Sequence, residues 1–155
     1  MEKIFHVIQA GYQIQAKVMM ENKDLITVIT GGNIPHIGVI LSYDCKERKQ
    51  QEIKIYSHNN HVHKDFYLAE RFAKGVIDTL PGNLCVIVGV HVDGITKEQI
   101  AAAFTMMDDL AKQIKQWLKT SPQHFHEPAY TTGITDQEMN LQSPADEWVS
   151  PSTHL

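Results

Sequence analysis

The hydrophobic pattern of this chain changes its period partway along, and this change constrains the fold more than any other feature. Residues 12–18 alternate strictly between apolar and polar side chains, as a half-buried strand does. From Lys64 to Leu80 the apolar side chains instead recur at helical spacing and form one stripe. The chain is therefore predicted to begin with strands and to turn to helices later.

Two β-branched runs follow the alternating segment and are expected to form neighbouring antiparallel strands. They cover Leu25 to Thr30 and Ile37 to Tyr43, and Gly31-Gly32-Asn33 separates them. The charged stretch from Asp44 to Glu52 is predicted to be an exposed turn, and Ile53 to Tyr56 a short strand after it. A meander of about four strands is thus predicted before any helix.

The second half of the chain predicts one more strand and one more helix. Leu84 to Val90 is short, apolar and β-branched, which favours a buried central strand. Thr96-Lys97-Glu98-Gln99 fits a capping box, and an apolar stripe from Ile100 to Leu118 continues the helix that it opens. The predicted order is ββββαβα, an α+β fold in which two helices pack on one face of a mainly antiparallel sheet.

The length of 155 residues suits one domain. We predict a single ligand-binding domain at residues 1–120, followed by an extension at 121–155 with four prolines, five acidic residues and no Lys or Arg. The aromatic and aliphatic residues of this extension leave two alternatives open. It either lies over the domain or a partner subunit, or is a frayed tail.

Charge and hydropathy exclude several classes of function. A formal net charge of −4 argues against a nucleic-acid binder. The N-terminal segment lacks the continuous apolar run of a signal peptide, and no apolar run reaches about 18 residues, so we expect a cytoplasmic protein with no membrane contact. Cys45 and Cys85 stand far apart and predict neither a disulfide framework nor a thiolate zinc site.

Histidines gather where the predicted elements end, namely His36, His58, His61, His63 and His91. In an extended segment His61 and His63 project from the same face, and His91 and Asp93 do so likewise. These four side chains could share a divalent metal such as zinc, iron or manganese, although their spacing matches no closed metal motif. Binding of an anion or planar cofactor is a second hypothesis, and histidines that only bond water a third.

Lys64 and the glycines add to the second hypothesis. A cation in the first turn of a helix faces the positive end of the helix dipole, and a phosphate bound by Lys64 and the helix amides would reverse that unfavourable term. Alternatively, Asp65 offsets Lys64, and the lysine points to water. Gly31 and Gly32 would let backbone approach a ligand closely, or simply form a turn.

Short motifs in these regions resemble the LpdD-like family. They are Thr30-Gly31-Gly32 with Pro35-His36-Ile37-Gly38, then His63-Lys64-Asp65, then Gly89-Val90-His91-Val92-Asp93. Members are small accessory proteins of gallate decarboxylase and similar UbiD-type hydroxyarylic acid decarboxylases, and are described as prenylated-flavin chaperones. The resemblance covers Lys3 to Leu118. It implies a fold similar to the proteasome-assembly chaperone subunits, and a homodimer.

The resemblance also implies a function in aromatic acid metabolism. The chain would be a non-catalytic carrier that holds prenylated FMN, or FMN, between a flavin prenyltransferase and a UbiD-type decarboxylase. The implied cofactor-binding residues are Gly31, Gly32, His36, Gly38, His63, Lys64, Asp65, His91 and Asp93. As a hypothesis, Lys64 and the helix amides meet the phosphate, while His36, His63 and His91 meet the isoalloxazine edge or a bridging metal. His58 and His61 fall outside the motifs.

Two other functions stay open. One is a metal-dependent enzyme, in which His61, His63, His91 and Asp93 hold the metal and a metal-bound water is the nucleophile. The other is a purely structural assembly chaperone that acts through protein surfaces alone.

Overall fold

The computed structural model describes residues 1–56, 64–135 and 137–138. The chain divides into two compact units, Met1–Phe125 and His126–Leu155. The elements of the first unit are β1 (Glu2–Gln9), β2 (Tyr12–Glu21), β3 (Asp24–Gly32), β4 (Val39–Asp44), β5 (Lys49–Lys54), α1 (Asp65–Val76), a 3-10 turn η1 (Ile77–Thr79), β6 (Leu84–His91) and α2 (Lys97–Thr120). None of the helices in the described residues is long and apolar enough to span a membrane.

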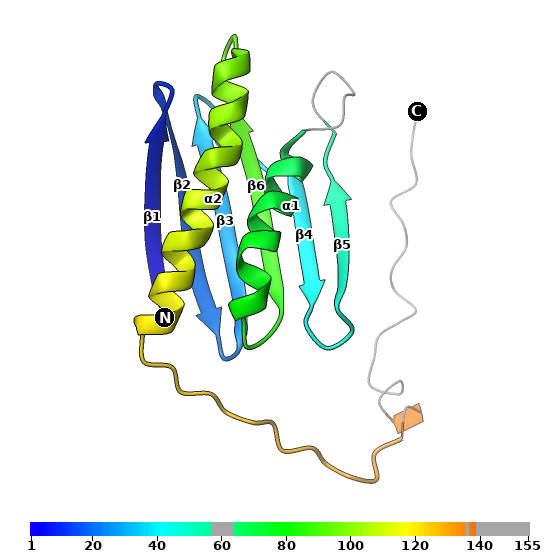
Figure 1. Ribbon diagram of the computed structural model, residues 1–155. Coiled ribbons are helices and arrows are strands. Elements are labelled where there is room, and N and C mark those ends of the chain that lie inside the picture. The colour runs from blue at the N-terminus through cyan, green and yellow to red at the C-terminus, as the bar shows by residue number, and fades with distance from the viewer. Residues whose placement is uncertain (57–63, 136, 139–155) are drawn as a thin grey trace, which may run out of the picture. The chain divides into compact units, whose positions relative to one another are not determined.

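The strands form one mixed sheet in the order β1-β2-β3-β6-β4-β5 (Figure 1). The first three strands are an antiparallel meander, in which β2 and β3 match the strands predicted at residues 12–18 and 25–30. Strand β6 lies parallel to β3 on one side and antiparallel to β4 on the other. It is the buried central strand that its apolar run predicts. The α+β class with a mainly antiparallel sheet is confirmed.

The predicted pairing of residues 25–30 with residues 37–43 was wrong. These runs belong to β3 and β4, and β6 lies between them. The physical reason is that the most apolar strand is most stable where it can pair on both edges and bury one face. Residues 33–38 therefore cross the end of β6 before β4 begins at Val39.

The count and limits of the early strands also differ from the prediction, because five strands precede α1. The unpredicted strand β1 lies at the sheet edge and buries only Phe5 fully, so its sequence shows little alternation. The polar strand β5 begins at Lys49, inside the stretch predicted to be a turn. Edge strands bury few side chains and thus leave a weak hydrophobic signal.

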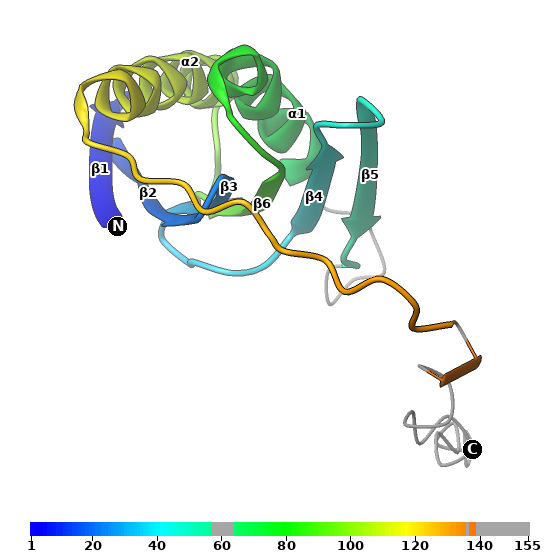
Figure 2. The same cartoon turned by 90° about the horizontal axis from the view of Figure 1, so that it is seen from below.

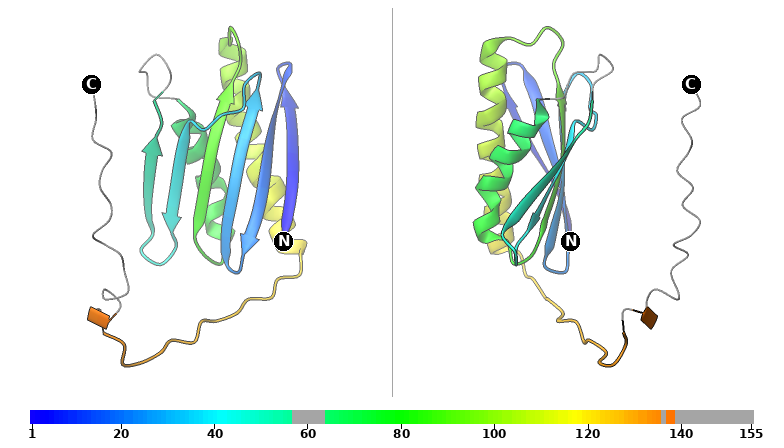
Figure 3. Two further views of the ribbon diagram at one scale, coloured as in Figure 1. Left: turned by 180° about the vertical axis from the view of Figure 1, so that it is seen from behind. Right: turned by 90° about the vertical axis from the view of Figure 1, so that its right-hand side faces the viewer.

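Both helices cover the same face of the sheet (Figures 2 and 3), which confirms the predicted layering. The buried stripe of α1 includes Leu68, Phe72 and Val76, and that of α2 includes Met107, Leu110 and Ile114. These side chains pack in one hydrophobic core with inward-facing strand residues such as Ile14, Ile29 and Leu41.

The predicted capping box at the start of α2 is present. The Gln99 N–H donates to Thr96 Oγ1 at 3.2 Å, and the Thr96 N–H donates to Gln99 Oε1 at 3.0 Å. Gln99 further ties α2 to the β1–β2 turn, because its Nε2 donates to the Ala10 carbonyl and its own carbonyl accepts from the Tyr12 hydroxyl. The cap therefore fixes where α2 meets the sheet.

Replacement of the cap, Thr96→Ala, is expected to lower the free energy of unfolding by about 1 kcal/mol, because an orphan amide of the first turn loses its acceptor. Urea denaturation followed by circular dichroism measures this loss. Thr105→Ala, at an exposed position within α2, is the control and should change stability by less than about 0.5 kcal/mol. Equal effects of the two substitutions would contradict the role of the cap.

Candidate functional site

Most of the predicted binding residues lie at one end of the sheet, where the parallel strands β3 and β6 finish. Gly32 on β3 pairs with His91 on β6, and Gly31 pairs with Val90. Eight of the predicted cofactor-binding residues are described by the structure and lie at this end of the sheet: Gly31, Gly32, His36, Gly38, Lys64, Asp65, His91 and Asp93. His58, His61 and His63 lie outside the described residues. The carboxyl ends of parallel strands are a common place for ligand sites in sheets of this kind.

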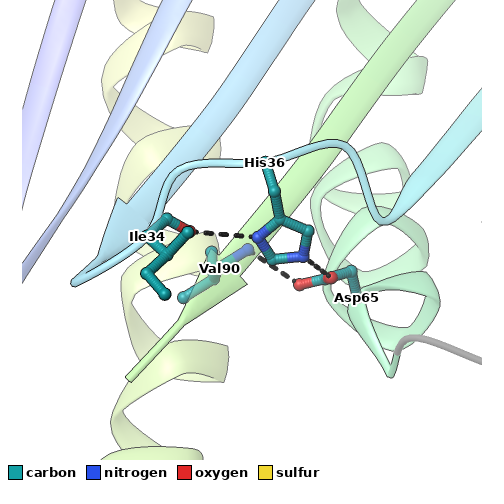
Figure 4. A network of polar contacts seen from close by, with 4 residues as sticks. All are labelled: Ile34, His36, Asp65 and Val90. Carbon is teal, nitrogen blue, oxygen red and sulfur yellow. Dashed lines mark hydrogen bonds and ion pairs between the residues drawn. The ribbon is translucent and has the colours of Figure 1, made fainter. Parts of the chain in front are cut away.

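Asp65 is the buried centre of this end of the sheet. It is the first residue of α1, and its side chain is 5% exposed. Its Oδ1 accepts the Val90 N–H at 2.9 Å, and its Oδ2 lies 3.1 Å from His36 Nε2 (Figure 4). One carboxylate thus joins the start of α1, the end of β6 and the β3–β4 crossover.

The imidazole of His36 is engaged within the protein at both nitrogens. Its Nδ1 lies 3.0 Å from the carbonyl oxygen of Ile34. Because a carbonyl can only accept, Nδ1 must carry a hydrogen, and the contact of Nε2 with Asp65 needs one further hydrogen from the ring or the carboxyl. This geometry gives His36 a positioning role, in which its imidazole holds the carboxylate of Asp65 in place.

Two glycines permit this close packing. A Cβ at Gly38 would overlap the carboxylate of Asp65, and one at Gly89 would overlap the carbonyl oxygen of His36. The Gly38 N–H also donates to the Val88 carbonyl at 2.8 Å, which holds the crossover against β6. Gly89 was not assigned to the site from sequence, although a glycine within a strand is a sign of close backbone approach.

His91 and Asp93 form a separate, exposed pair at the same end. His91 Nε2 lies 2.9 Å from Asp93 Oδ1, and the two side chains are 49% and 70% exposed. Asn33, which was not assigned from sequence, links this pair to β3. Its side chain accepts the Asp93 N–H, and its own N–H donates to the His91 carbonyl. An exposed ion pair of this kind contributes little stability and leaves the imidazole accessible.

A groove of about 360 Å³ opens between the start of α1, the first half of α2 and the end of β6. Lys64, Asp65 and His91 contribute its polar lining, and Tyr67, Ile95 and Phe104 are among its apolar walls. Its size lies within the range of small-molecule sites. The predicted glycines and His36 do not line it, so the groove gathers only part of the predicted site.

Ile100 also lines this groove, although its place in the apolar stripe predicted a core position. Its side chain is 46% exposed. The stripe of α2 extends beyond the sheet at its first turn, so the apolar pattern there marks a groove wall and not the core. A larger hollow of about 480 Å³ at the opposite end of the sheet contains none of the predicted residues.

The metal hypothesis remains a prediction. Within residues 1–56 and 64–135, no three His, Cys, Asp or Glu side chains come together in a way that could hold a metal ion. Two of the four proposed ligands, His61 and His63, lie outside the described residues. Elemental analysis of protein purified without a histidine tag tests this prediction.

Replacement of the buried carboxylate, Asp65→Ala, is expected to lower the free energy of unfolding by about 2–4 kcal/mol, because it leaves the Val90 amide and His36 without their acceptor. Chemical denaturation measures the loss. The matched control is Asp93→Ala, which breaks an exposed histidine–aspartate pair and should cost less than about 1 kcal/mol. Similar losses for both variants would show that Asp65 does not join the three elements.

Two comparisons with known proteins agree with each other. The family model described as the prenylated flavin chaperone LpdD-like domain matches residues 8–119. The curated protein named Protein LpdD, from Lactiplantibacillus plantarum (strain ATCC BAA-793 / NCIMB 8826 / WCFS1), is 41% identical over 126 residues, which cover 81% of this chain and 92% of the relative. This membership supports a chaperone role. The chain belongs to the LpdD-like prenylated flavin chaperone family.

Proposed function

We propose that this protein is a non-catalytic carrier that holds prenylated FMN in the groove between α1, α2 and the end of β6. The observation that carries the proposal is the composition of the groove, in which apolar walls adjoin Lys64 and the first turn of α1. A flavin has the matching chemistry, since a planar apolar ring system is joined through a flexible chain to a phosphate. The description of the family model supports the same ligand.

The phosphate would lie at Lys64. No side chain among the described residues caps the start of α1, and the amides of a helix start bind phosphate oxygens well. The buried carboxylate of Asp65 offsets part of the positive helix end, so the nearby ammonium group of Lys64 supplies attraction that the amides alone would lack. His91, at the rim of the groove, offers an exposed imidazole for hydrogen bonding or stacking.

The titratable groups of the groove suit holding a ligand better than transforming one. Asp65 is already engaged by His36 and the Val90 amide, and His91 pairs with Asp93 at an exposed rim. We therefore assign the chemistry to partners. The carrier would receive its cargo from a flavin prenyltransferase in the cytoplasm and release it to a UbiD-type decarboxylase that acts on aromatic acids such as gallate.

The direct test is to mix the purified protein with FMN or prenylated FMN and to follow co-elution by visible absorbance. We expect prenylated FMN to be retained by the wild type and lost from Ile100→Lys, which puts a charge on an apolar wall. Ile53→Lys, an equally drastic change on a strand outside the groove, should retain the flavin. A folded wild-type protein that retains neither flavin would contradict the proposal.

The phosphate contact has its own prediction. Lys64→Ala should reduce the preference for FMN over riboflavin by about tenfold, because only FMN carries the phosphate, and about tenfold corresponds to one charge-assisted hydrogen bond. Fluorescence titration measures both affinities. Lys74→Ala, in the last turn of α1, is the control and should leave the preference unchanged. A preference that survives in Lys64→Ala would place the phosphate elsewhere.

A purely structural chaperone would behave differently. If the protein acted through its surfaces alone, His91→Ala and Ile100→Lys would activate the decarboxylase as well as the wild type does. The carrier predicts that both variants activate it poorly while their circular dichroism spectra stay unchanged.

A further inference from the structure

The second half of α2 carries three lysines on one side of the helix. Lys112, Lys115 and Lys119 are spaced by three and four residues, which places them in one line along a helix. We call these three residues the lysine row. All three line a groove of about 270 Å³ between α2 and the end of α1, where Gly75 and Ala111 let the two helices approach closely. The three positive charges therefore belong to one surface.

The acidic side chains next to the lysine row are already bound by other residues. Arg71 donates from Nε to Asp108 Oδ1 and from Nη2 to Oδ2, both at 2.7 Å, and this bidentate contact holds the pKa of Asp108 below its usual value. Asp109 Oδ2 accepts from Gln9 Nε2 at 3.1 Å. Within the described part of the chain, no ion pair joins the lysine row to an acidic residue. These residues therefore leave the charge of the row unneutralised.

The lysine row is unfavourable for α2 in isolation. Lys115 precedes Lys119 by four residues and follows Lys112 by three, and like charges at these spacings destabilise a helix. The negative end of the helix dipole favours a cation only in the last turn, so it accounts for Lys119 alone. A negatively charged ligand would remove the repulsion, because its anionic groups would lie against the ammonium groups.

The surroundings of the lysine row favour an acidic protein segment over other anions. Single-stranded nucleic acids stack on exposed aromatic side chains, and amphipathic helices enter anionic membranes through exposed apolar ones. Residues 101–124, all of which the structure describes, contain no exposed large apolar or aromatic side chain. Phe5 and Trp117, which lie beside the row, are only 7% and 9% exposed. Electrostatic contact with carboxylates is the interaction that this surface offers.

We infer that the lysine row is the docking site of an acidic segment of a partner protein. The two ends of the row are seven residues apart, or about 10 Å along the helix axis, so one inorganic anion would not reach all three lysines. Carboxylates at positions i, i+3 and i+7 of a facing helix have the same spacing, and each would pair with one lysine. Charge complementarity of this kind speeds association and fixes the register of two proteins.

The position of the lysine row suits a partner that exchanges cargo with the flavin groove. That groove opens beside the start of α2, the row lies near its end, and α2 lies on the helix side of the sheet (Figure 1). Ile100 and Lys115 are fifteen residues apart, or about 22 Å along the helix, so one protein domain spans both. The decarboxylase that receives the flavin is the partner that we assign. This assignment rests on the proposed function, whereas the docking site does not.

Fluorescence anisotropy with a labelled acidic peptide tests the docking site on the full chain. The probe is a helical peptide of about 20 residues with glutamates at positions i, i+3 and i+7 of one face. At physiological salt, the wild type should bind it at least about tenfold more tightly than a row-reversed variant does. That variant carries the substitutions Lys112→Glu, Lys115→Glu and Lys119→Glu.

The matched control has the same change of charge at three exposed lysines away from the row, and it should bind the peptide as the wild type does. It carries Lys46→Glu, Lys49→Glu and Lys97→Glu. A single neutral change, Lys115→Gln, should also weaken binding, and it tests the row even if the row-reversed variant fails to fold. A peptide with lysines in place of the glutamates should prefer the row-reversed variant to the wild type.

Four results would overturn the inference. They are a wild type that does not bind the peptide, a control variant that loses as much affinity as the row-reversed one, equal binding of a peptide with the same glutamates spread around the helix, and tighter binding of RNA or of phosphatidylserine vesicles to the lysine row.

Transfer of prenylated FMN to the flavin-free decarboxylase tests the assignment of the partner. The row-reversed variant should retain the flavin on co-elution but deliver it at least about tenfold more slowly at low salt, and the difference should shrink at high salt because ions screen the contact. Equal transfer rates would overturn the assignment. A wild type that retains no flavin would contradict the proposed function, while the peptide result would still decide the docking site.

Discussion

One buried carboxylate holds together the end of the sheet that carries the candidate site. Asp65 begins α1, accepts the amide of Val90 from the end of β6 and contacts His36 from the crossover between β3 and β4. Three segments that are distant in sequence therefore meet at one side chain. Gly38 and Gly89 leave the space that this meeting needs. Since a buried carboxylate is costly unless it is bonded, this arrangement fixes the groove wall and the crossover together.

The sequence predicted the layers of the fold well, because hydrophobic period and a capping box are local signals. It missed β1 and placed the limits of β5 wrongly, since edge strands bury few residues. The predicted pairing of residues 25–30 with residues 37–43 was wrong, because β6 lies between them. Strand order depends on which strand is stabilised most at the centre of the sheet, and the local sequence does not show this.

For the candidate site too, the sequence indicated the region but not the contacts. Residue types at the ends of elements indicated where it lies, but only the structure shows that Lys64, Asp65 and His91 line the groove while His36 contacts Asp65 from outside it. Ile100 shows what hydrophobic periodicity cannot predict. An apolar stripe on a helix indicates which side chains avoid water, but it does not distinguish a core position from the wall of a groove.

The groove and most of its apolar walls lie on the helix side of the sheet. The helix side ends in a groove whose apolar walls adjoin Lys64, and we propose that a phosphorylated planar molecule binds there. The proposed carrier must shield its cargo and still release it, and an open groove at the end of the sheet is compatible with both needs. Ile100 lines this groove and Ile53 on β5 does not, so a comparison of substitutions at the two positions separates an effect on the groove from a general effect on the sheet.

The central claim is that the groove holds the flavin, and amide hydrogen exchange with and without prenylated FMN tests it most directly. Bound ligand should slow exchange at the start of α1 and across residues 92–104, which supply the walls, and leave β4 and β5 unchanged. Protection confined to other segments, or no protection at saturating flavin, would contradict the account.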